Sequence, residues 1–182
     1  MRSKQYARYS PMPQIIEVRG SYPAIDSTVW LADDVVVTGN VSIGANSSIW
    51  FKSIIRGDVC SIKIGEETNV QDAVIIHGTY QKSDTWIGNR VSIGHRAIIH
   101  GCTIHDDVLV GMGAIIMDDA ILESNIIVAA GAVVTSGSVL SSGGIYAGVP
   151  AVKIKEPGPE KIAEIVKKGA SNYIMYTGWY RT

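Results

Sequence analysis

The stretch that decides the fold is TIHDDVLVGMGAIIMDDAILESNIIVAAGAVV, residues 103–134. An aliphatic residue returns at every sixth position within it: Ile104, Val110, Ile116, Leu122, Val128 and Val134. This spacing fits neither an amphipathic helix, with a period of about 3.6, nor an alternating strand, with a period of about 2. It is typical of a parallel β-helix, in which each hexapeptide forms a short strand and a corner and the aliphatic side chain points into a narrow core.

The same spacing extends toward the N-terminus. The upstream aliphatic residues are Leu31, Val37, Ile43, Ile49 and Ile55, then Ile64, Val70 and Ile76, then Ile87, Ile93 and Ile99. A second set, four places after the aliphatics, is also predicted to be buried: Val35, Val41, Ser47, Thr68, Val74, Val91, Ala97, Val108, Ala114 and Ala132. An up-and-down β-sandwich is disfavoured, because its turns should recur every roughly 8–12 residues.

Both ends of the repeat can be placed from the sequence. The aliphatic series is expected to end near Val134, before a Gly- and Pro-rich exit. Pro159 then suits the first turn of a helix, in which Ile162, Ile165, Val166 and Tyr173 form one apolar stripe. The sequence therefore predicts an all-β fold with an N-terminal segment over 1–21, a β-helix over 22–152, and a C-terminal α-helix and tail over 153–182.

Composition limits the functions that this chain can have. Of its 182 residues, 46% are hydrophobic and 18% are charged, and the formal net charge is −1. We expect no nucleic-acid partner, since there is no basic patch, and no membrane span, since no apolar run approaches about 20 residues. The two cysteines, Cys60 and Cys102, form no CxxC pair and are predicted to be reduced in a cytoplasmic protein.

Three of the four histidines lie in IIHGTYQKSDTWIGNRVSIGHRAIIHG, residues 75–101. Arg56, His77 and His100 each follow an aliphatic residue of the same face, so the spacing predicts that they stack in adjacent coils about 4.8 Å apart. Two imidazole nitrogens roughly 3.3 Å apart would suit a tetrahedral zinc ion. His77 and His100 are therefore a candidate pair of metal ligands.

His95 differs because it lies on another face, near a corner and above Asp72. It can reach the histidine pair only of a neighbouring prism, which predicts a metal shared between subunits in a closed ring, with three subunits favoured. The fourth position of the metal would stay open, as in catalytic zinc sites. His105 stands alone and is expected to have no such role.

With these residues in view, the chain resembles the γ-class carbonic anhydrases. The matching motifs are IIRGD (54–58), TNVQDAVIIH (68–77), IGHRAIIHGC (93–102) and YAGVPAVKI (146–154). The resemblance implies a left-handed β-helix, a homotrimer, and reversible hydration of carbon dioxide to bicarbonate by a metal-bound hydroxide. The implied metal is Zn²⁺, with Fe²⁺ or Co²⁺ as alternatives because imidazole suits all three.

The resemblance also assigns roles to individual residues. His77 and His100 would be ligands from one subunit, and His95 the ligand from its neighbour. Five further residues would serve catalysis: Arg56 and Asp58 as an interface ion pair, Asn69 and Gln71 as groups that orient the metal-bound water and bicarbonate, and Asp72 as a carboxylate beside a ligand.

Two departures from the family pattern concern proton transfer. Val59 stands where the family's archetype has a glutamate, and the loop GTYQKSDTW is short, with Asp84 as its one acid. Asp84 or Tyr173 is therefore a candidate proton shuttle.

Two alternatives to a carbonic anhydrase remain open. One is a hexapeptide-repeat acyltransferase or thioesterase, and the other is a non-catalytic metal-binding or assembly homologue.

Overall fold

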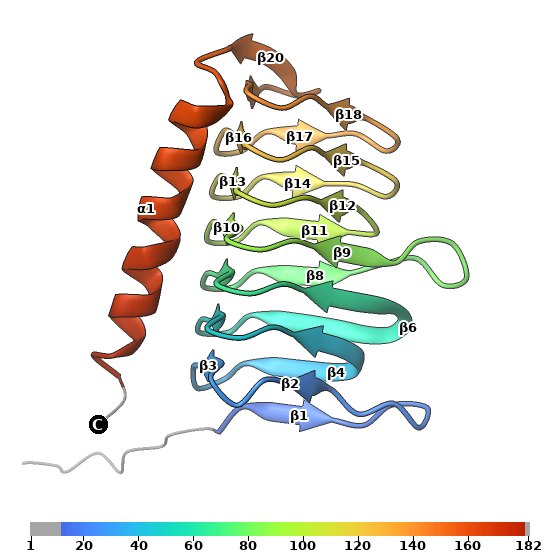
Figure 1. The fold of residues 1–182 in the computed structure, drawn as a ribbon. Coiled ribbons are helices and arrows are strands. Elements are labelled where there is room, and N and C mark those ends of the chain that lie inside the picture. The colour runs from blue at the N-terminus through green and yellow to red at the C-terminus, as the bar shows by residue number, and fades with distance from the viewer. Residues whose placement is uncertain (1–11, 181–182) are drawn as a thin grey trace, which may run out of the picture.

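A computed structural model describes residues 12–180 as a triangular β-helix of about seven coils flanked by one helix (Figure 1). Face A holds β1 (Gln14–Ile16), β8 (Ile75–His77), β11 (Ile98–His100), β14 (Ile115–Ile116) and β17 (Val133–Val134), with the first halves of β4 (Val36–Ile43) and β6 (Ile54–Ile64). Face B holds β2 (Ala24–Ile25), β9 (Thr85–Ile87), β12 (Thr103–Ile104), β15 (Ile121–Leu122) and β18 (Val139–Leu140), with the second halves of β4 and β6. Face C holds β3 (Trp30–Leu31), β5 (Ser48–Ile49), β7 (Asn69–Val70), β10 (Ser92–Ile93), β13 (Val108–Val110), β16 (Ile126–Val128) and β19 (Ile145–Ala147).

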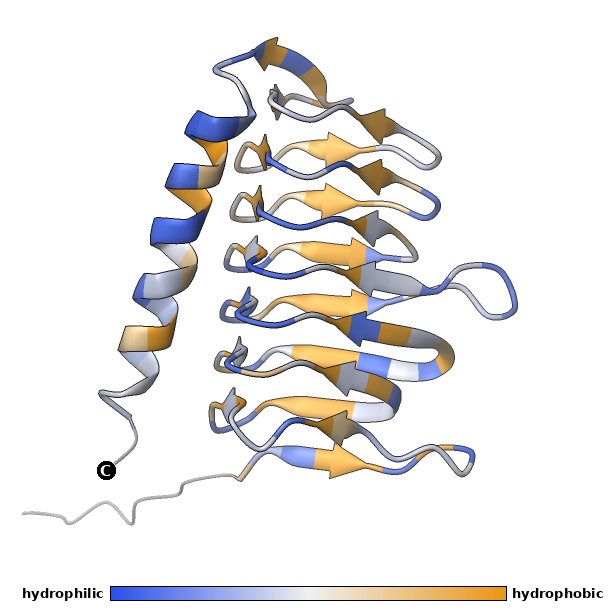
Figure 2. Ribbon diagram, viewed as in Figure 1, coloured by the Kyte–Doolittle hydropathy of each residue, from blue (hydrophilic) through white to orange (hydrophobic). Residues whose placement is uncertain are grey.

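Neighbouring coils pair as parallel strands, and the pairing of β4 with β6 shifts register once, between Gly39 and Val41. Ile55 lies beside Ile76, and Ile76 beside Ile99, so side chains of one slot stack along the axis. The predicted inward residues from Val37 to Val134 are at most 4% exposed and form one continuous core, while Leu31 at the open end is partly exposed. The strands therefore carry most of the hydrophobic colour in Figure 2. The predicted left-handed parallel β-helix is confirmed, as is the burial of the second residue set.

The β-helix extends beyond the expected series at both ends. Strand β1, within the segment expected to precede the β-helix, pairs with β4, and Ile15 lies beside Val37. At the other end, the inward positions continue past Val134 with Leu140 and Tyr146. At the N-terminal end the repeat was missed because an insertion separates Ile15 from Ile25. At the other end Leu140 keeps the six-residue spacing and could have been included, whereas Tyr146 breaks the aliphatic pattern. Of the predicted N-terminal segment, residues 1–11 lie outside the described residues.

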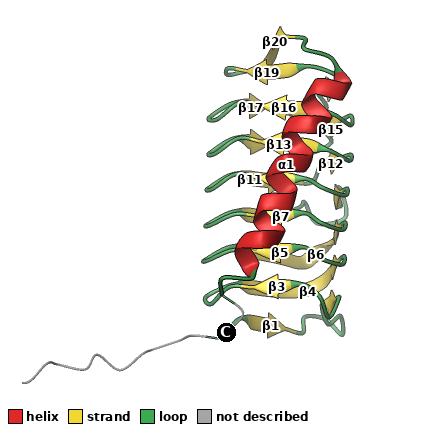
Figure 3. Ribbon diagram, turned by 60° about the vertical axis from the view of Figure 1, so that its left-hand side comes forward, coloured by secondary structure: helices red, strands yellow, loops and turns green. Residues whose placement is uncertain are grey.

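The end of the β-helix is closed by β20 (Val152–Lys155), which pairs antiparallel with β19. Helix α1 (Pro159–Thr177) then runs back along face C (Figure 3). Ile162, Val166 and Ala170 are buried against this face, whereas Ile165 is 47% exposed, so its predicted place in the buried stripe was wrong. Ile165 lies one position before Val166 and so is turned away from the sheet.

No helix within 12–180 has the length and apolarity needed to cross a membrane.

Close approach of the corners explains the small residues that follow the aliphatics. A Cβ on Gly65 would lie 2.6 Å from the carbonyl carbon and oxygen of Gly88 in the next coil. Gly169, on α1, differs because a Cβ there would lie 3.6 Å from Ser92 Oγ, which is an ordinary contact. The coil spacing therefore requires a glycine at position 65, whereas the helix only tolerates one at position 169.

We predict that Gly65→Ala lowers the free energy of unfolding by about 1–3 kcal/mol, because the methyl group forces the corners apart. Gly169→Ala should raise it by up to about 1 kcal/mol, since alanine favours a helix over glycine. Urea denaturation of both variants at one protein concentration measures the two effects. A Gly65→Ala variant as stable as the parent would contradict the close packing of the coils.

Candidate metal centre

The two face-A histidines meet where β8 and β11 end. His77 and His100 are register partners, and their ring centroids are 5.3 Å apart. His77 Nδ1 lies 3.3 Å from His100 Nε2. Two nitrogens bound at about 2.0–2.1 Å to one tetrahedral ion lie at nearly this separation. The pair thus has the spacing expected of two ligands on one metal ion.

The remaining nitrogen of each ring contacts a carboxylate from a neighbouring coil. His77 Nε2 lies 3.1 Å from Asp58 Oδ1, and His100 Nδ1 lies 3.1 Å from Asp118 Oδ2. A carboxylate only accepts hydrogen bonds, so each of these nitrogens donates and the two facing nitrogens keep their lone pairs. Burial lowers the pKa of His77, so its ring is neutral at neutral pH, as a metal ligand requires.

Arg56 and Asp58 border the pair on the coil before His77. Arg56 Nη1 donates to Asp58 Oδ2 at 2.5 Å, and Arg56 Nη2 lies 3.4 Å from His77 Nδ1. Burial alone would raise the pKa of Asp58, but hydrogen bonds from Arg56 and His77 outweigh it and hold that pKa low. The ion pair thus lies within one chain and links the guanidinium to the imidazole.

The other predicted residues gather at a different corner, where face C turns into face A. His95 Nδ1 lies 2.7 Å from Asp72 Oδ2, as its position above Asp72 predicted. Gln71 donates from Nε2 to Asn69 Oδ1 at 3.1 Å, and Asn69 donates from Nδ2 to Ser92 Oγ at 2.8 Å. Gln71 and His95 line one largely apolar cavity of about 350 Å³.

One chain therefore carries two groups of site residues at the opposite ends of face A. Within residues 12–180, no three His, Cys, Asp or Glu side chains converge closely enough to hold a metal ion. His77 and His100 are brought together, whereas His95 lies with Asp72 on the other corner. His105 packs edge-to-face against Trp86, with ring centroids 5.3 Å apart, and takes part in neither group.

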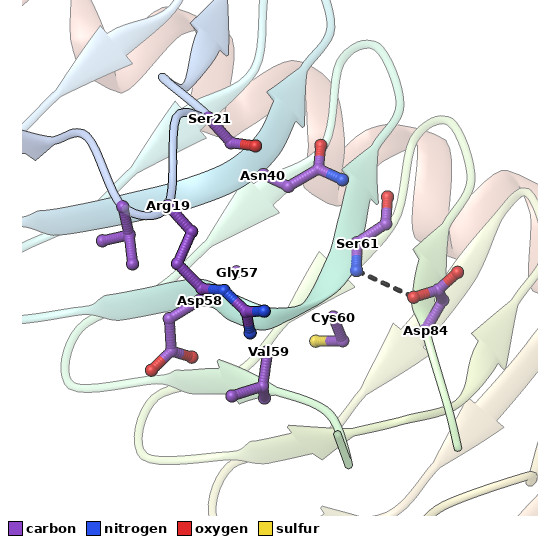
Figure 4. A pocket seen from close by; sticks show the side chains of 10 residues that line it. Arg19, Ser21, Asn40, Gly57, Asp58, Val59, Cys60, Ser61 and Asp84 are labelled. Atoms are coloured by element: carbon purple, nitrogen blue, oxygen red, sulfur yellow. Dashed lines mark hydrogen bonds between the residues drawn. The ribbon is translucent and has the colours of Figure 1, made fainter. Parts of the chain in front are cut away.

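A polar pocket of about 410 Å³ opens beside Asp58 (Figure 4). Val59, Cys60 and Asp84 line it, and Asp84 Oδ1 accepts a hydrogen bond from the Ser61 backbone N–H at 2.7 Å. Asp58 contacts His77, so this pocket joins the histidine pair to Asp84. Tyr173, the other shuttle candidate, packs on Trp50, and burial raises its pKa to about 12, which makes it a poor proton relay near neutral pH.

Neither cysteine has the character of a nucleophile. Both are free thiols, as predicted. Burial raises the pKa of Cys60 to about 11 and that of Cys102 to about 12, so both stay protonated at neutral pH. Thioester chemistry that needs a cysteine thiolate therefore has no support here.

Asp118, which contacts His100 from the next coil, was not predicted from the sequence. The available signal was its place two positions after the face-A aliphatic Ile116, one coil beyond His100. Many corner positions carry aspartate, such as Asp107 and Asp119, so position alone did not distinguish it.

Comparisons with known proteins identify relatives of this chain. The bacterial transferase hexapeptide (six repeats) family matches residues 101–136. Gamma carbonic anhydrase 2, mitochondrial, of Arabidopsis thaliana is 38% identical over 88% of this chain, which spans 59% of that relative's length. A Methanocaldococcus jannaschii protein named probable carbonic anhydrase is 45% identical over 82% of this chain and 93% of its own.

The fold also matches a solved structure closely. A hexapeptide transferase family protein from Anaplasma phagocytophilum superposes with a TM-score of 0.86 at 39% identity, and the match covers 92% of this chain and 98% of that one. The coil geometry, the motifs and these relatives together show that the chain belongs to the gamma carbonic anhydrase family of hexapeptide-repeat proteins.

Proposed function

We propose that this protein catalyses the reversible hydration of carbon dioxide to bicarbonate at a zinc ion held by His77 and His100 of one subunit and His95 of its neighbour. The observation that carries this proposal is the 3.3 Å separation of two facing imidazole nitrogens, each ring anchored to a carboxylate through its other nitrogen. The relatives named carbonic anhydrases support the same reaction. Reduced cysteines favour a cytoplasmic location.

A homotrimer is supported by the outer surface of face A. Its outward positions form a ladder of aliphatic residues beside the histidine pair: Val36, Ile54, Ile75, Ile98, Ile115 and Val133. Ile54, Ile75 and Ile98 are 36–38% exposed, and a contiguous apolar strip of this kind is typical of a subunit interface. A closed ring of three prisms would bring the His95 corner of one subunit to the His77 corner of the next.

The residues of the chain fit the hydration reaction. When bound, a divalent ion supplies Lewis acidity and lowers the pKa of its water to about 7. Arg56 places a positive charge 3.4 Å from His77, where it would attract bicarbonate. Asn69 fixes the Gln71 amide, which would orient the attacking water. Asp72 would hold the His95 ring through Nδ1. Three imidazoles would accept Zn²⁺, Fe²⁺ or Co²⁺.

Stopped-flow carbon dioxide hydration, measured on protein loaded in turn with zinc and with iron, tests this function. We expect turnover that depends on the metal and disappears on chelation. A flat trace at full metal occupancy would favour the non-catalytic metal-binding homologue instead. Turnover of acyl-CoA by metal-free protein would favour the acyltransferase reading, which the transferase name of the Anaplasma structure keeps open.

We predict that zinc stabilises the parent protein and no longer stabilises His100→Ala. Metal at about 100 times its dissociation constant should add about 2.7 kcal/mol to the free energy of unfolding. The matched control is His105→Ala, because His105 contacts Trp86 and lies outside both groups of site residues. Thermal unfolding with and without zinc measures the difference. Equal stabilisation of His100→Ala and His105→Ala would exclude His100 as a ligand.

We also predict that Asp84→Asn lowers kcat in weak buffer, by up to about 10²-fold, because the proton loses its route through the pocket beside Asp58. The asparagine keeps the oxygen that accepts from Ser61, so the loop should stay folded. Added imidazole buffer should restore turnover. Tyr173→Phe is the control and should leave the buffer dependence unchanged. A buffer dependence unaltered in Asp84→Asn would remove Asp84 from the mechanism.

A further inference from the structure

Asp118 occupies a closely built position next to the histidine pair. It follows β14, one coil beyond His100, and its Oδ2 accepts from His100 Nδ1 at 3.1 Å. Its Oδ1 accepts from Thr79 Oγ1 at 2.9 Å and from Ser83 Oγ at 2.5 Å. Both oxygens are thus engaged, and the side chain is only 18% exposed. Asp118 therefore has one orientation available to it.

The loop after His77 is shaped to make these contacts. Ser83 N–H donates to the Thr79 carbonyl at 3.1 Å, and Thr79 N–H donates to Ser83 Oγ at 3.2 Å, which folds residues 79–83 into a compact turn. This turn directs both hydroxyls at the same carboxylate oxygen. Gly101, with φ of 55°, leaves the space, because a Cβ there would collide with Ser83 and Asp118. The short loop thus braces Asp118 from the side away from His100.

The position of Asp118 decides which nitrogen of His100 is free. Oδ1 of Asp118 already accepts from two hydroxyls, and Oδ2 lies within hydrogen-bond distance of His100 Nδ1, so the proton of a neutral His100 ring lies on Nδ1. The lone pair is then on Nε2, the atom that faces His77 Nδ1 at 3.3 Å.

We propose that Asp118, braced by Thr79 and Ser83, is a positioning residue that fixes the tautomer and ring orientation of His100 for metal binding. The inference rests on the proposed function, since it assumes a metal ion between His77 and His100. It assigns to the short loop a role in bracing the metal centre. Asp58, which contacts the His77 ring, is held by a charged partner, Arg56. Asp118, which contacts the His100 ring, is held by two neutral hydroxyls.

The test compares Asp118→Asn with Asp119→Asn in the assembled protein. Asp119 is the adjacent residue, half-exposed, and pairs with Lys82 at 3.6 Å, so it is a matched control. Cobalt affinity is measured by competition with a chelating indicator, and the visible absorption spectrum of the bound cobalt reports ligand geometry. We expect Asp118→Asn to bind cobalt about 10–100-fold more weakly with an altered spectrum, and Asp119→Asn to match the parent.

Two further variants keep the test decisive if Asp118→Asn does not fold. Thr79→Val and Ser83→Ala each remove one donor to Asp118 and leave the carboxylate in place. Each should weaken cobalt binding, by less than Asp118→Asn does, while thermal unfolding of the metal-free protein changes little. A merely structural role would lower that metal-free stability and leave the cobalt spectrum unchanged.

The outcomes separate this inference from the proposed function. Parent-like cobalt affinity and spectrum in Asp118→Asn, or in both loop variants should Asp118→Asn not fold, would overturn the role of Asp118 alone. A parent protein that binds cobalt but does not hydrate carbon dioxide when loaded with zinc or iron would overturn the proposed reaction and leave the positioning role standing. A parent protein that binds no cobalt would overturn both.

Discussion

The whole structure depends on the vertical register between parallel coils. Because Ile55, Ile76 and Ile99 lie in one slot, the residues that follow them must also stack, and these are Arg56, His77 and His100. The hydrophobic core thus sets the spacing of the polar column on its outer edge. Burial of the inward aliphatics stabilises the coils. The strand pairing of β8 with β11 sets the spacing of His77 and His100, whose facing imidazole nitrogens lie 3.3 Å apart. No loop has to close to form this pair.

Much of this could be read from the sequence, because a six-residue period fixes both which side chains point inward and which share a slot. The stacking of His77 on His100 and of His95 above Asp72 followed from counting alone. The rest depended on contacts that counting cannot reach. The bracing of Asp118 by Thr79 and Ser83 joins residues 35 and 39 positions apart through a loop of irregular length. The outward turn of Ile165 depends on how α1 lies on face C, which the pattern of the helix does not set by itself.

The chain separates the chemistry of the site between two corners of one prism. The face-A histidines, Arg56 and their carboxylates belong to one corner, whereas His95 and the Gln71 amide belong to the other, beside a largely apolar cavity. The aliphatic ladder on the outside of face A lies between them. Such an arrangement suits a site that is completed only when subunits assemble. The aliphatic ladder that would join the subunits and the histidine pair lie on the same strands of face A. Val59 carries no acid and the loop after His77 is short, so Asp84 is the candidate proton shuttle in the pocket that Asp58 also lines.

Subunit complementation tests the shared site most directly. His95→Ala and His100→Ala are each expected to be inactive, since each removes one ligand from every site. In trimers assembled at random from equal amounts of the two variants, about three quarters contain both, and each of these has one intact site of the three. We therefore predict that the mixture regains about a quarter of the parent's metal content and hydration activity. A mixture as inactive and metal-poor as either variant alone, despite proven mixed assembly, would contradict it.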